Sequence, residues 1–274
     1  MHRPAAVIAR ARVVAAARSA VDAALDLVLP PTCVACERLL SAPADALVCR
    51  LCWARVVPLA APRCDRCGHP ADGHACRWCP LLPPYVRAVR SSCWVSSGTA
   101  LAIVHALKYG AWTAVAPGMA KRMGRMVFPE DVERERTAIV PVPLARDRER
   151  ERGYNQSALL GEALATIWRI PMWSDVLQRS RRTETQTRLT PEQRRHNVSG
   201  AFRVAAGAGT RLRGAHVIIV DDVVTTAATL NACASALFDG GARIISYATF
   251  GRAPAIGDRV ETTGELLDGN SRRH

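Results

Sequence analysis

One short stretch constrains the fold of this chain more than any other: four apolar residues that lead into two acids and a threonine-rich segment. Residues 217–220 read Val-Ile-Ile-Val, all β-branched, and the run is too short for a helix. Such a run is typical of a strand that is covered on both faces, in the middle of a parallel sheet. Asp221 and Asp222 follow directly, and we expect them to end the strand. The predicted fold class is therefore α/β.

The residues after the acids complete a strand–helix–strand unit. Segment 225–229, Thr-Thr-Ala-Ala-Thr, leads into a helical run at 230–238 that Gly240 and Gly241 stop, and residues 243–250 are predicted to form the next strand. This connection places the threonine segment at the carboxyl edge of the sheet. Ligands of open α/β sheets bind at that edge.

The chemistry of this edge suits a sugar phosphate. Backbone N–H groups at the start of a helix bind phosphate without a positive side chain, and threonine hydroxyls add donors. Asp221 and Asp222 repel an anion, so they suit hydroxyl groups or a magnesium ion beside it. A plainer interpretation is a buried strand followed by acids that cap a helix. The expected phosphate-binding residues are Thr225, Thr226, Ala227, Ala228 and Thr229.

Size and charge allow an enzyme, a ligand-binding protein or a nucleic-acid-binding protein. The 274 residues have room for one medium and one small domain, and 49% hydrophobic residues support a real core. Lys and Arg outnumber Asp and Glu by 37 to 24, a net charge of +13 that indicates an anionic partner such as phosphates or nucleic acid. With 5% aromatic residues, an extended stacking platform for bases is disfavoured.

Eight of the ten cysteines form four Cys-x-x-Cys pairs between residues 33 and 79. Two tight turns of this kind aim four sulfurs at one point, the arrangement of a tetrahedral zinc site. Four thiolates leave no position for a substrate, so these zinc ions would be structural and would supply most of the folding energy of this segment. We pair neighbours, with a crossed arrangement as the alternative: Cys33, Cys36, Cys49 and Cys52 on one ion, and Cys64, Cys67, Cys76 and Cys79 on the other.

Other side chains between the cysteines have simpler expected roles. His69 and His74 lie between cysteine pairs and are expected to face solvent, with metal ligation as the alternative. Trp53 and Trp78 are expected to form small apolar cores, although stacking on unpaired bases is an alternative. Cys233 is expected in the core.

The two ends of the chain suggest neither an export signal nor a membrane span. Residues 5–29 alternate Arg with Ala and Val and predict an amphipathic helix that packs on the protein, with membrane contact or a transit peptide as alternatives. We predict a cytoplasmic protein that is not an integral membrane protein. The expected divisions are a helix at 1–29, a double zinc ribbon at 30–82, a main domain at 83–255 and a polar, disordered tail at 256–274.

The middle of the chain supplies the remaining elements of the sheet. We expect strands at 86–96 and 138–144, the second ended by its prolines, and helices at 99–109, at 114–128 with a basic face, and from about 153–157 to 168. Lys108, at the end of one helix, is expected to be solvated, with an anion as the alternative partner.

Two arginine-rich stretches are candidates for contact with a pyrophosphate. Arg148 and Arg152 belong to an Arg–acid alternation that usually marks a solvated face, but it follows a strand edge directly. Residues 181–202 predict a polar, mobile loop and then a short helix with a capping box at 190–193. Such a loop closes over a reactive ligand in many enzymes, and the alternative is a plain surface connection.

The stretch at 217–229 resembles the binding signature of type I phosphoribosyltransferases. Pro141-Val-Pro143, residues 152–156 (Arg-Gly-Tyr-Asn-Gln) and residues 200–202 (Gly-Ala-Phe), behind paired zinc ribbons, resemble the ComF family over roughly residues 25–255. The same likeness extends to Gln186-Thr187, Leu189, Arg194 and Asn197-Val198. That family is associated with DNA uptake in natural competence. One departure is Ala227, where the family usually has Gly, which matters if the position requires a positive φ.

The resemblance implies a set of roles. Asp221 and Asp222 would hold the ribose hydroxyls of phosphoribosyl pyrophosphate, residues 225–229 its 5′-phosphate, and magnesium would bind with the substrate. Asp221, Asp222 and Arg152 are the expected catalytic residues, acting by positioning and charge stabilisation. The expected pyrophosphate contacts are Arg148, Arg152 and Arg194, with Arg188 and Arg182 as weaker candidates.

Three functions stay open from the sequence. The first is transfer of phosphoribosyl to an unknown acceptor. The second is non-catalytic binding of phosphoribosyl pyrophosphate or a nucleotide as a regulatory ligand. The third is an accessory role on single-stranded DNA or with the DNA-uptake machinery, in which ribbons and arginines contact the backbone.

Overall fold

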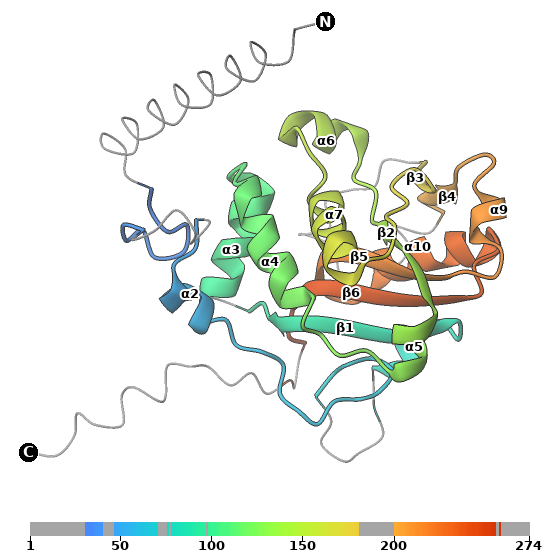
Figure 1. Cartoon of the computed structure of the whole chain (residues 1–274), viewed down its shortest axis with the longest axis horizontal. Helices are drawn as coiled ribbons and strands as arrows, with labels where there is room; N and C mark the ends of the chain where they lie inside the picture. Colours follow the sequence, from blue (N-terminus) through green and yellow to red (C-terminus); the bar gives the residue numbers. More distant parts are fainter. Residues whose placement is uncertain are drawn as a thin grey trace, which may run out of the picture.

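Four parallel strands form the central sheet of the protein. The structure is a computed structural model that describes residues 31–40, 47–70, 76, 78–96, 98–180, 200–255 and 258 (Figure 1). The order across the sheet is β1 (Val86–Trp94), β6 (Ile244–Arg252), β5 (His216–Val224) and β2 (Arg136–Pro141). The predicted parallel sheet is confirmed, with the apolar run 217–220 in an interior strand.

Strand β5 runs further than the sequence suggested. Its pairing with β6 continues past the acids, with Asp221 opposite Thr249 and Val224 opposite Arg252. The prediction that the acids end the strand was therefore wrong, because main-chain pairing holds two more residues in the ladder. Strand β2 does end at Pro141, as the prolines predicted.

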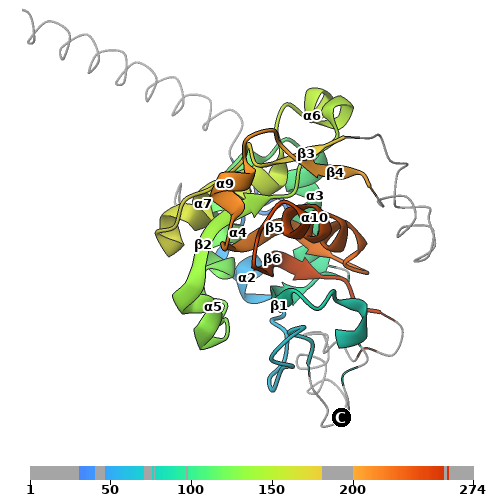
Figure 2. The ribbon, with the colours of Figure 1, turned by 90° about the vertical axis from the view of Figure 1, so that its right-hand side faces the viewer.

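Helices cover both faces of the sheet (Figures 1 and 2). Helices α3 (Gly98–Tyr109), α4 (Ala116–Met123) and α7 (Gln156–Trp168) share one apolar core with Ile218 and Val220. Helix α10 (Ala228–Asp239) shares the other core with Val217 and Ile219. Alternate residues of β5 thus face opposite cores, as expected for a strand covered on both sides.

Two helical predictions need correction. The run 114–128 is helical only in η3 (Thr113–Val115) and α4, because the chain leaves the helix at Gly124 and buries Met126 and Phe128 instead. The Arg–acid alternation, which was not predicted as a helix, forms α6 (Arg146–Arg152) with no buried residue. The smaller elements are α2 (Arg50–Ala54), η2 (Cys79–Leu81), α5 (Glu130–Glu135), α9 (Gly209–Leu212) and the antiparallel pair β3 (Leu177–Arg179) and β4 (Phe202–Val204).

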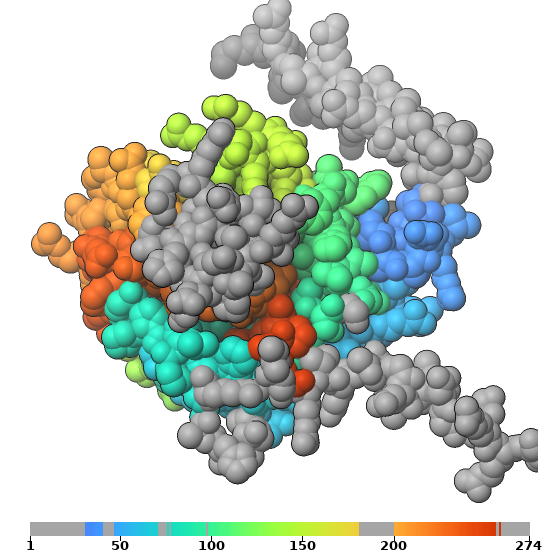
Figure 3. Space-filling view, turned by 180° about the vertical axis from the view of Figure 1, so that it is seen from behind, coloured from blue at the N-terminus to red at the C-terminus, as the bar shows by residue number. Residues whose placement is uncertain are grey.

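The cysteine-rich region packs against the sheet edge at β1. The backbone N–H of Val89 donates to the carbonyl of Arg66 at 2.8 Å, and that of Trp94 donates to Val57 at 3.1 Å. Figure 3 shows the blue first part of this region beside the green surface of α3 and α4. The ribbons therefore extend the two cores of the main sheet.

Some predictions fall on residues outside the described part of the chain. These are the helix at 5–29, His74, most of the segment 181–202 including Arg182, Arg188 and Arg194, and nearly all of the tail from 256. Among the helices of the described residues, none has the length and apolar character needed to cross a bilayer.

Candidate functional site

A cavity of about 550 Å³ lies at the carboxyl edge of the sheet. Each strand contributes lining at or just past its carboxyl end: Val95 after β1, residues 142–145 after β2, Asp221 to Val224 at the end of β5, and Ala253 after β6. Because the strands are parallel, these ends meet at one edge, where open α/β sheets bind ligands. Side walls come from α3 and α6.

The two acids face this cavity but are held differently. Asp221 is half-buried, and its Oδ1 accepts from the Ser157 hydroxyl at 2.8 Å and from the Asp222 backbone N–H at 2.9 Å. Asp222 is 3% exposed; its Oδ1 accepts from Val223 N at 2.8 Å and its Oδ2 lies 2.6 Å from Lys108 Nζ. Within the described chain, Oδ2 of Asp221 receives no hydrogen bond. Asp221 is thus the acid with an oxygen to offer a ligand.

Burial and the charge of Asp222 raise the pKa of Asp221 to about 7. Burial alone would lower the pKa of Lys108, but the charges of Asp222 and Asp221 raise it above its usual value. The expectation that Lys108 is solvated was therefore wrong, and its ammonium offsets one of the two negative charges at the edge of the sheet.

The threonine segment forms a turn beside the same cavity, and all five of its residues, Thr225 to Thr229, line the cavity. Ala227 has φ 59° and ψ 8°, the left-handed region, and is the N-cap of the 12-residue helix α10. The N-terminus of α10 has no side-chain cap, and the positive end of the helix dipole favours an anion at this position. The positive φ that would favour Gly is thus present at Ala227, at a cost of roughly 1 kcal/mol.

Arg148 and Arg152 line the cavity from α6. Arg152 donates through Nη1 to Gln156 Oε1 at 2.6 Å, and its guanidinium lies 5.6 Å from the centre of the Tyr109 ring. Arg179, His105 and Tyr109 also line the cavity, and none of them was predicted as a site residue. Ser157, which donates to Asp221, was not predicted either. The local signal for Ser157 is its position in the first turn of α7, where Asn155 is the N-cap and accepts from the backbone N–H of Ser157.

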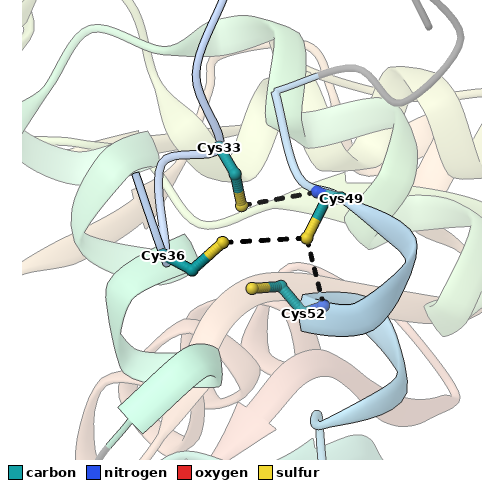
Figure 4. Close-up of side chains that lie close together, drawn as sticks. All are labelled: Cys33, Cys36, Cys49 and Cys52. Carbon is teal, nitrogen blue, oxygen red and sulfur yellow. Dashed lines mark hydrogen bonds between the residues drawn. The ribbon is translucent and has the colours of Figure 1, made fainter. Parts of the chain in front are cut away.

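The first cysteine cluster is formed by Cys33, Cys36, Cys49 and Cys52 (Figure 4). The thiols of Cys36 and Cys49 lie 3.8 Å apart, and the backbone of Cys49 donates to the sulfur of Cys33 at 3.4 Å. Burial works against the thiolate of Cys33, but hydrogen bonds from the backbone of Cys49, Ala35 and Cys36 outweigh it and lower the pKa of that thiol to about 7. Zinc at about 2.3 Å from each sulfur would separate the sulfurs by about 3.8 Å, so the cluster fits the ion.

The second cluster is formed by Cys64, Cys67, Cys76 and Cys79. Its sulfurs lie 3.4 Å apart between Cys64 and Cys79 and 3.2 Å apart between Cys67 and Cys76. In each cluster the four ligand atoms lie within 4.8 Å of one another, which is the neighbour pairing. Four sulfurs complete a tetrahedron, so each zinc ion would hold its own ribbon together and would leave no position for a substrate.

His69 corrects another expectation. It is 9% exposed, its Nε2 lies 3.0 Å from Asp258 Oδ1, and its ring stacks on Trp78 at 5.3 Å. The histidine therefore joins the second ribbon to the chain beyond β6 and does not face solvent. Trp53 also reaches past its ribbon, edge-on to Phe250 in the core at 6.4 Å.

Comparison with known proteins agrees with both halves of this architecture. A double zinc ribbon domain model matches residues 24–80, and a phosphoribosyl transferase domain model matches residues 155–263. The chain is 34% identical over 210 residues to DNA utilization protein YhgH of Salmonella typhi, covering 72% of this chain and 87% of the relative. Competence protein F of Haemophilus influenzae is 38% identical over 112 residues, covering 41% of this chain and 45% of the relative.

The chain belongs to the ComF family. Competence protein ComFC of Bacillus subtilis matches at 23% identity over 206 residues, with 72% of this chain and 80% of the relative covered. Among solved structures, adenine phosphoribosyl transferase from Trypanosoma brucei matches with 12% identity and a TM-score of 0.31, over 60% of this chain and 79% of that chain. The parallel sheet, the cysteine clusters and the two domain models confirm the predicted fold class of this ComF family protein.

Proposed function

We propose that this ComF family protein binds phosphoribosyl pyrophosphate, together with magnesium, in the cavity at the carboxyl edge of the sheet, and transfers the phosphoribosyl group to an acceptor. The observation that carries the proposal is a convergence. An uncapped helix N-terminus, an acid with an available oxygen and three arginines, Arg148, Arg152 and Arg179, line one cavity. These three groups suit a phosphate, a sugar hydroxyl and a second anionic group, in one molecule.

The 5′-phosphate would bind at the turn of residues 225–229. Its oxygens would accept from backbone amides at the start of α10 and from threonine hydroxyls. Asp221 would accept from a ribose hydroxyl through Oδ2. Asp222, held on both oxygens by Val223 and Lys108, would orient its neighbour and set the charge of the site.

The pyrophosphate would extend toward α6, where Arg148 and Arg152 line the cavity. In the transfer, the bond between C1′ and the pyrophosphate oxygen breaks and its electron pair leaves with pyrophosphate. The acceptor forms the new bond to C1′ with its lone pair and then loses a proton. Arg152 would stabilise the departing charge, and the cavity walls would hold the reactants in line.

The residues fit a magnesium ion that arrives with the substrate. Oδ2 of Asp221 is a carboxylate oxygen, and the remaining ligands would be substrate oxygens and water, the set that magnesium favours. When bound, the ion would neutralise charge on the pyrophosphate.

We propose further that the protein acts in DNA uptake in the cytoplasm, with the ribbons at 30–82 and the main domain at 83–255 as its working parts. The names of the relatives support this association, and the net charge of +13 suits single-stranded DNA as a partner. Fluorescence anisotropy with labelled single-stranded DNA checks it: binding should weaken steeply with salt. Binding that does not change with salt would contradict a backbone contact.

Calorimetry with the full chain tests the ligand site. Phosphoribosyl pyrophosphate should bind the wild-type protein, more tightly with magnesium, and binding should be lost in the double variant Asp221→Asn, Asp222→Asn. Asp175→Asn, an exposed acid paired with Arg211, is the matched control and should bind normally. Unchanged affinity in the double variant would overturn the site, and pyrophosphate release in a metabolite mixture would separate transfer from binding alone.

A further inference from the structure

The second zinc ribbon lies directly behind the phosphate-binding turn. A small void of about 20 Å³ separates them. Cys67, Trp78 and Leu82 line it from the ribbon side, and residues 224–227 line it from the turn side. Ala227, Trp78 and Cys67 belong to the same apolar cluster. The ribbon is therefore packed against the back of the turn whose front faces the ligand cavity.

Hydrogen bonds join the same two parts on either side of this contact. The buried Arg252 donates through Nη2 to the carbonyl of Cys67 at 2.7 Å, and the next residue, Ala253, donates its backbone N–H to Val224 at 2.9 Å. Asn231, in the first turn of α10, donates to the carbonyl of Leu81 at 2.9 Å. The turn is thus tied to the ribbon both before and after its own residues. In Figure 3 the cyan surface after the second cluster adjoins the orange-red surface of α10.

The second ribbon packs closely against strand β1. A Cβ added to Gly68 would lie 2.2 Å from the carbonyl oxygen of Val89, so only glycine allows this approach. Arg66 donates to four carbonyls between Cys79 and Val86. Gly68 and Arg66 therefore hold the ribbon against β1. Trp78 lies between Cys76 and Cys79 of the second cluster, and Trp78 and Leu82 reach the turn.

The left-handed backbone of Ala227 explains why the turn needs this contact. A non-glycine residue in the left-handed region persists where its surroundings over-determine it. The cavity-facing side of the turn is open, so the support must come from behind, where the ribbon lies. The first cluster does not contact the turn in this way. Among the described residues, none of its cysteines lines either cavity, and Cys33 and Cys52 pack in the core on the opposite face of the sheet.

We propose that the second zinc ribbon positions the phosphate-binding turn, with Trp78, Asn231 and Arg252 as positioning residues, so that loss of its metal disorders the turn. The first ribbon has no part in this. The inference rests on the proposed function only for the identity of the ligand, because the state of the turn is measurable without one.

The experiment compares two partly buried cysteines, Cys76→Ser in the second cluster and Cys36→Ser in the first, in the full chain at a temperature where circular dichroism shows both folded. Hydrogen exchange is followed on peptides that cover residues 221–232, without ligand. Calorimetry then measures the affinity for phosphoribosyl pyrophosphate with magnesium. Cys76→Ser should speed exchange of the turn amides and weaken binding about tenfold, whereas Cys36→Ser should change both less than about twofold.

A second variant keeps the proposal testable if Cys76→Ser does not fold. Asn231→Ala retains all eight cysteines, removes the bond to Leu81 and the bond from Tyr247, and should speed exchange of the turn while zinc content stays at the wild-type level. Tyr247→Phe, which removes the second bond alone, is the control and should leave exchange of the turn near the wild-type rate. Equal exchange of the turn in the Cys76, Asn231 and Cys36 variants would overturn the positioning role. Faster exchange in a protein that binds no phosphoribosyl pyrophosphate would leave the positioning role standing and overturn the proposed function alone.

Discussion

The elements packed on the two faces of the sheet supply different parts of the cavity at its carboxyl edge. On one face, the first cysteine cluster shares a core with α3 and α7, which bring Lys108 and Ser157 to the two acids. On the other face, the second cluster shares a core with α10 and supports the turn at its start. Both clusters are built from two Cys-x-x-Cys pairs, but they pack in different cores. Each metal therefore influences the part of the cavity that its own core supports.

The largest expected effect is on stability from the first face. Cys52 is 1% exposed in the core it shares with Phe250, so Cys52→Ser should lower the free energy of unfolding by about 4 kcal/mol or more through loss of the metal. Denaturant unfolding and metal analysis measure this. The control is Cys93→Ser, a buried cysteine of the same core outside both clusters, which should retain both metals and lose much less. Similar losses of stability in the two variants would contradict a stabilising role for metal binding at the first cluster.

Next is the buried ion pair that the first face brings to the acids. Lys108→Met leaves Asp222 charged and 3% exposed without its cation, which should cost roughly 3 kcal/mol of stability. Affinity for phosphoribosyl pyrophosphate should fall with it, because the site becomes more negative toward an anion. Lys121→Met, on α4, serves as the control in the same unfolding and calorimetric measurements and should match the wild type. A Lys108→Met protein of full stability would show that the pair is incidental.

The pH dependence sharpens the same point. The folded pKa of Asp221 is raised to about 7 from 3.8, so the folded state holds a proton that the unfolded state loses. Stability from this group is therefore full below about pH 4 and is lost as pH rises to about 7. Asp221→Asn should abolish that slope in unfolding experiments. Ligand affinity should change the opposite way and rise through pH 7 in the wild type, since the ionised oxygen accepts the ribose hydroxyl; a flat affinity profile would argue against Asp221 as the contact.

The smallest expected effect concerns the turn on the second face. Ala227→Gly relieves the left-handed strain but frees the unfolded chain, so the net gain in stability should be about 0.5 kcal/mol. With a relaxed turn, the faster exchange of the turn amides caused by Asn231→Ala should shrink, which a double-mutant cycle followed by hydrogen exchange measures. Strictly additive effects would mean that the ribbon supports the turn without relieving strain at Ala227.

The sequence predicted those parts of the fold and site that depend on neighbours in the chain. The run 217–220, the turn after it and the Cys-x-x-Cys spacing all act within a few residues, so the strand, the turn and the two clusters could be predicted. The partner of Lys108 is Asp222, more than a hundred residues away, and which way the end of α3 points depends on how α3 packs. The same holds for the contact of His69 with Asp258 and for the contact of the second ribbon with Ala227. Both join residues far apart in the chain, so no local sequence pattern predicts them.

The most direct test of the central claim is a crystal structure of the full chain with phosphoribosyl pyrophosphate and magnesium. We expect the 5′-phosphate on the backbone amides of residues 225–229, a ribose hydroxyl on Asp221 Oδ2 and pyrophosphate beside Arg148 and Arg152. A ligand bound elsewhere, or a 5′-phosphate held by side chains away from the turn, would contradict it.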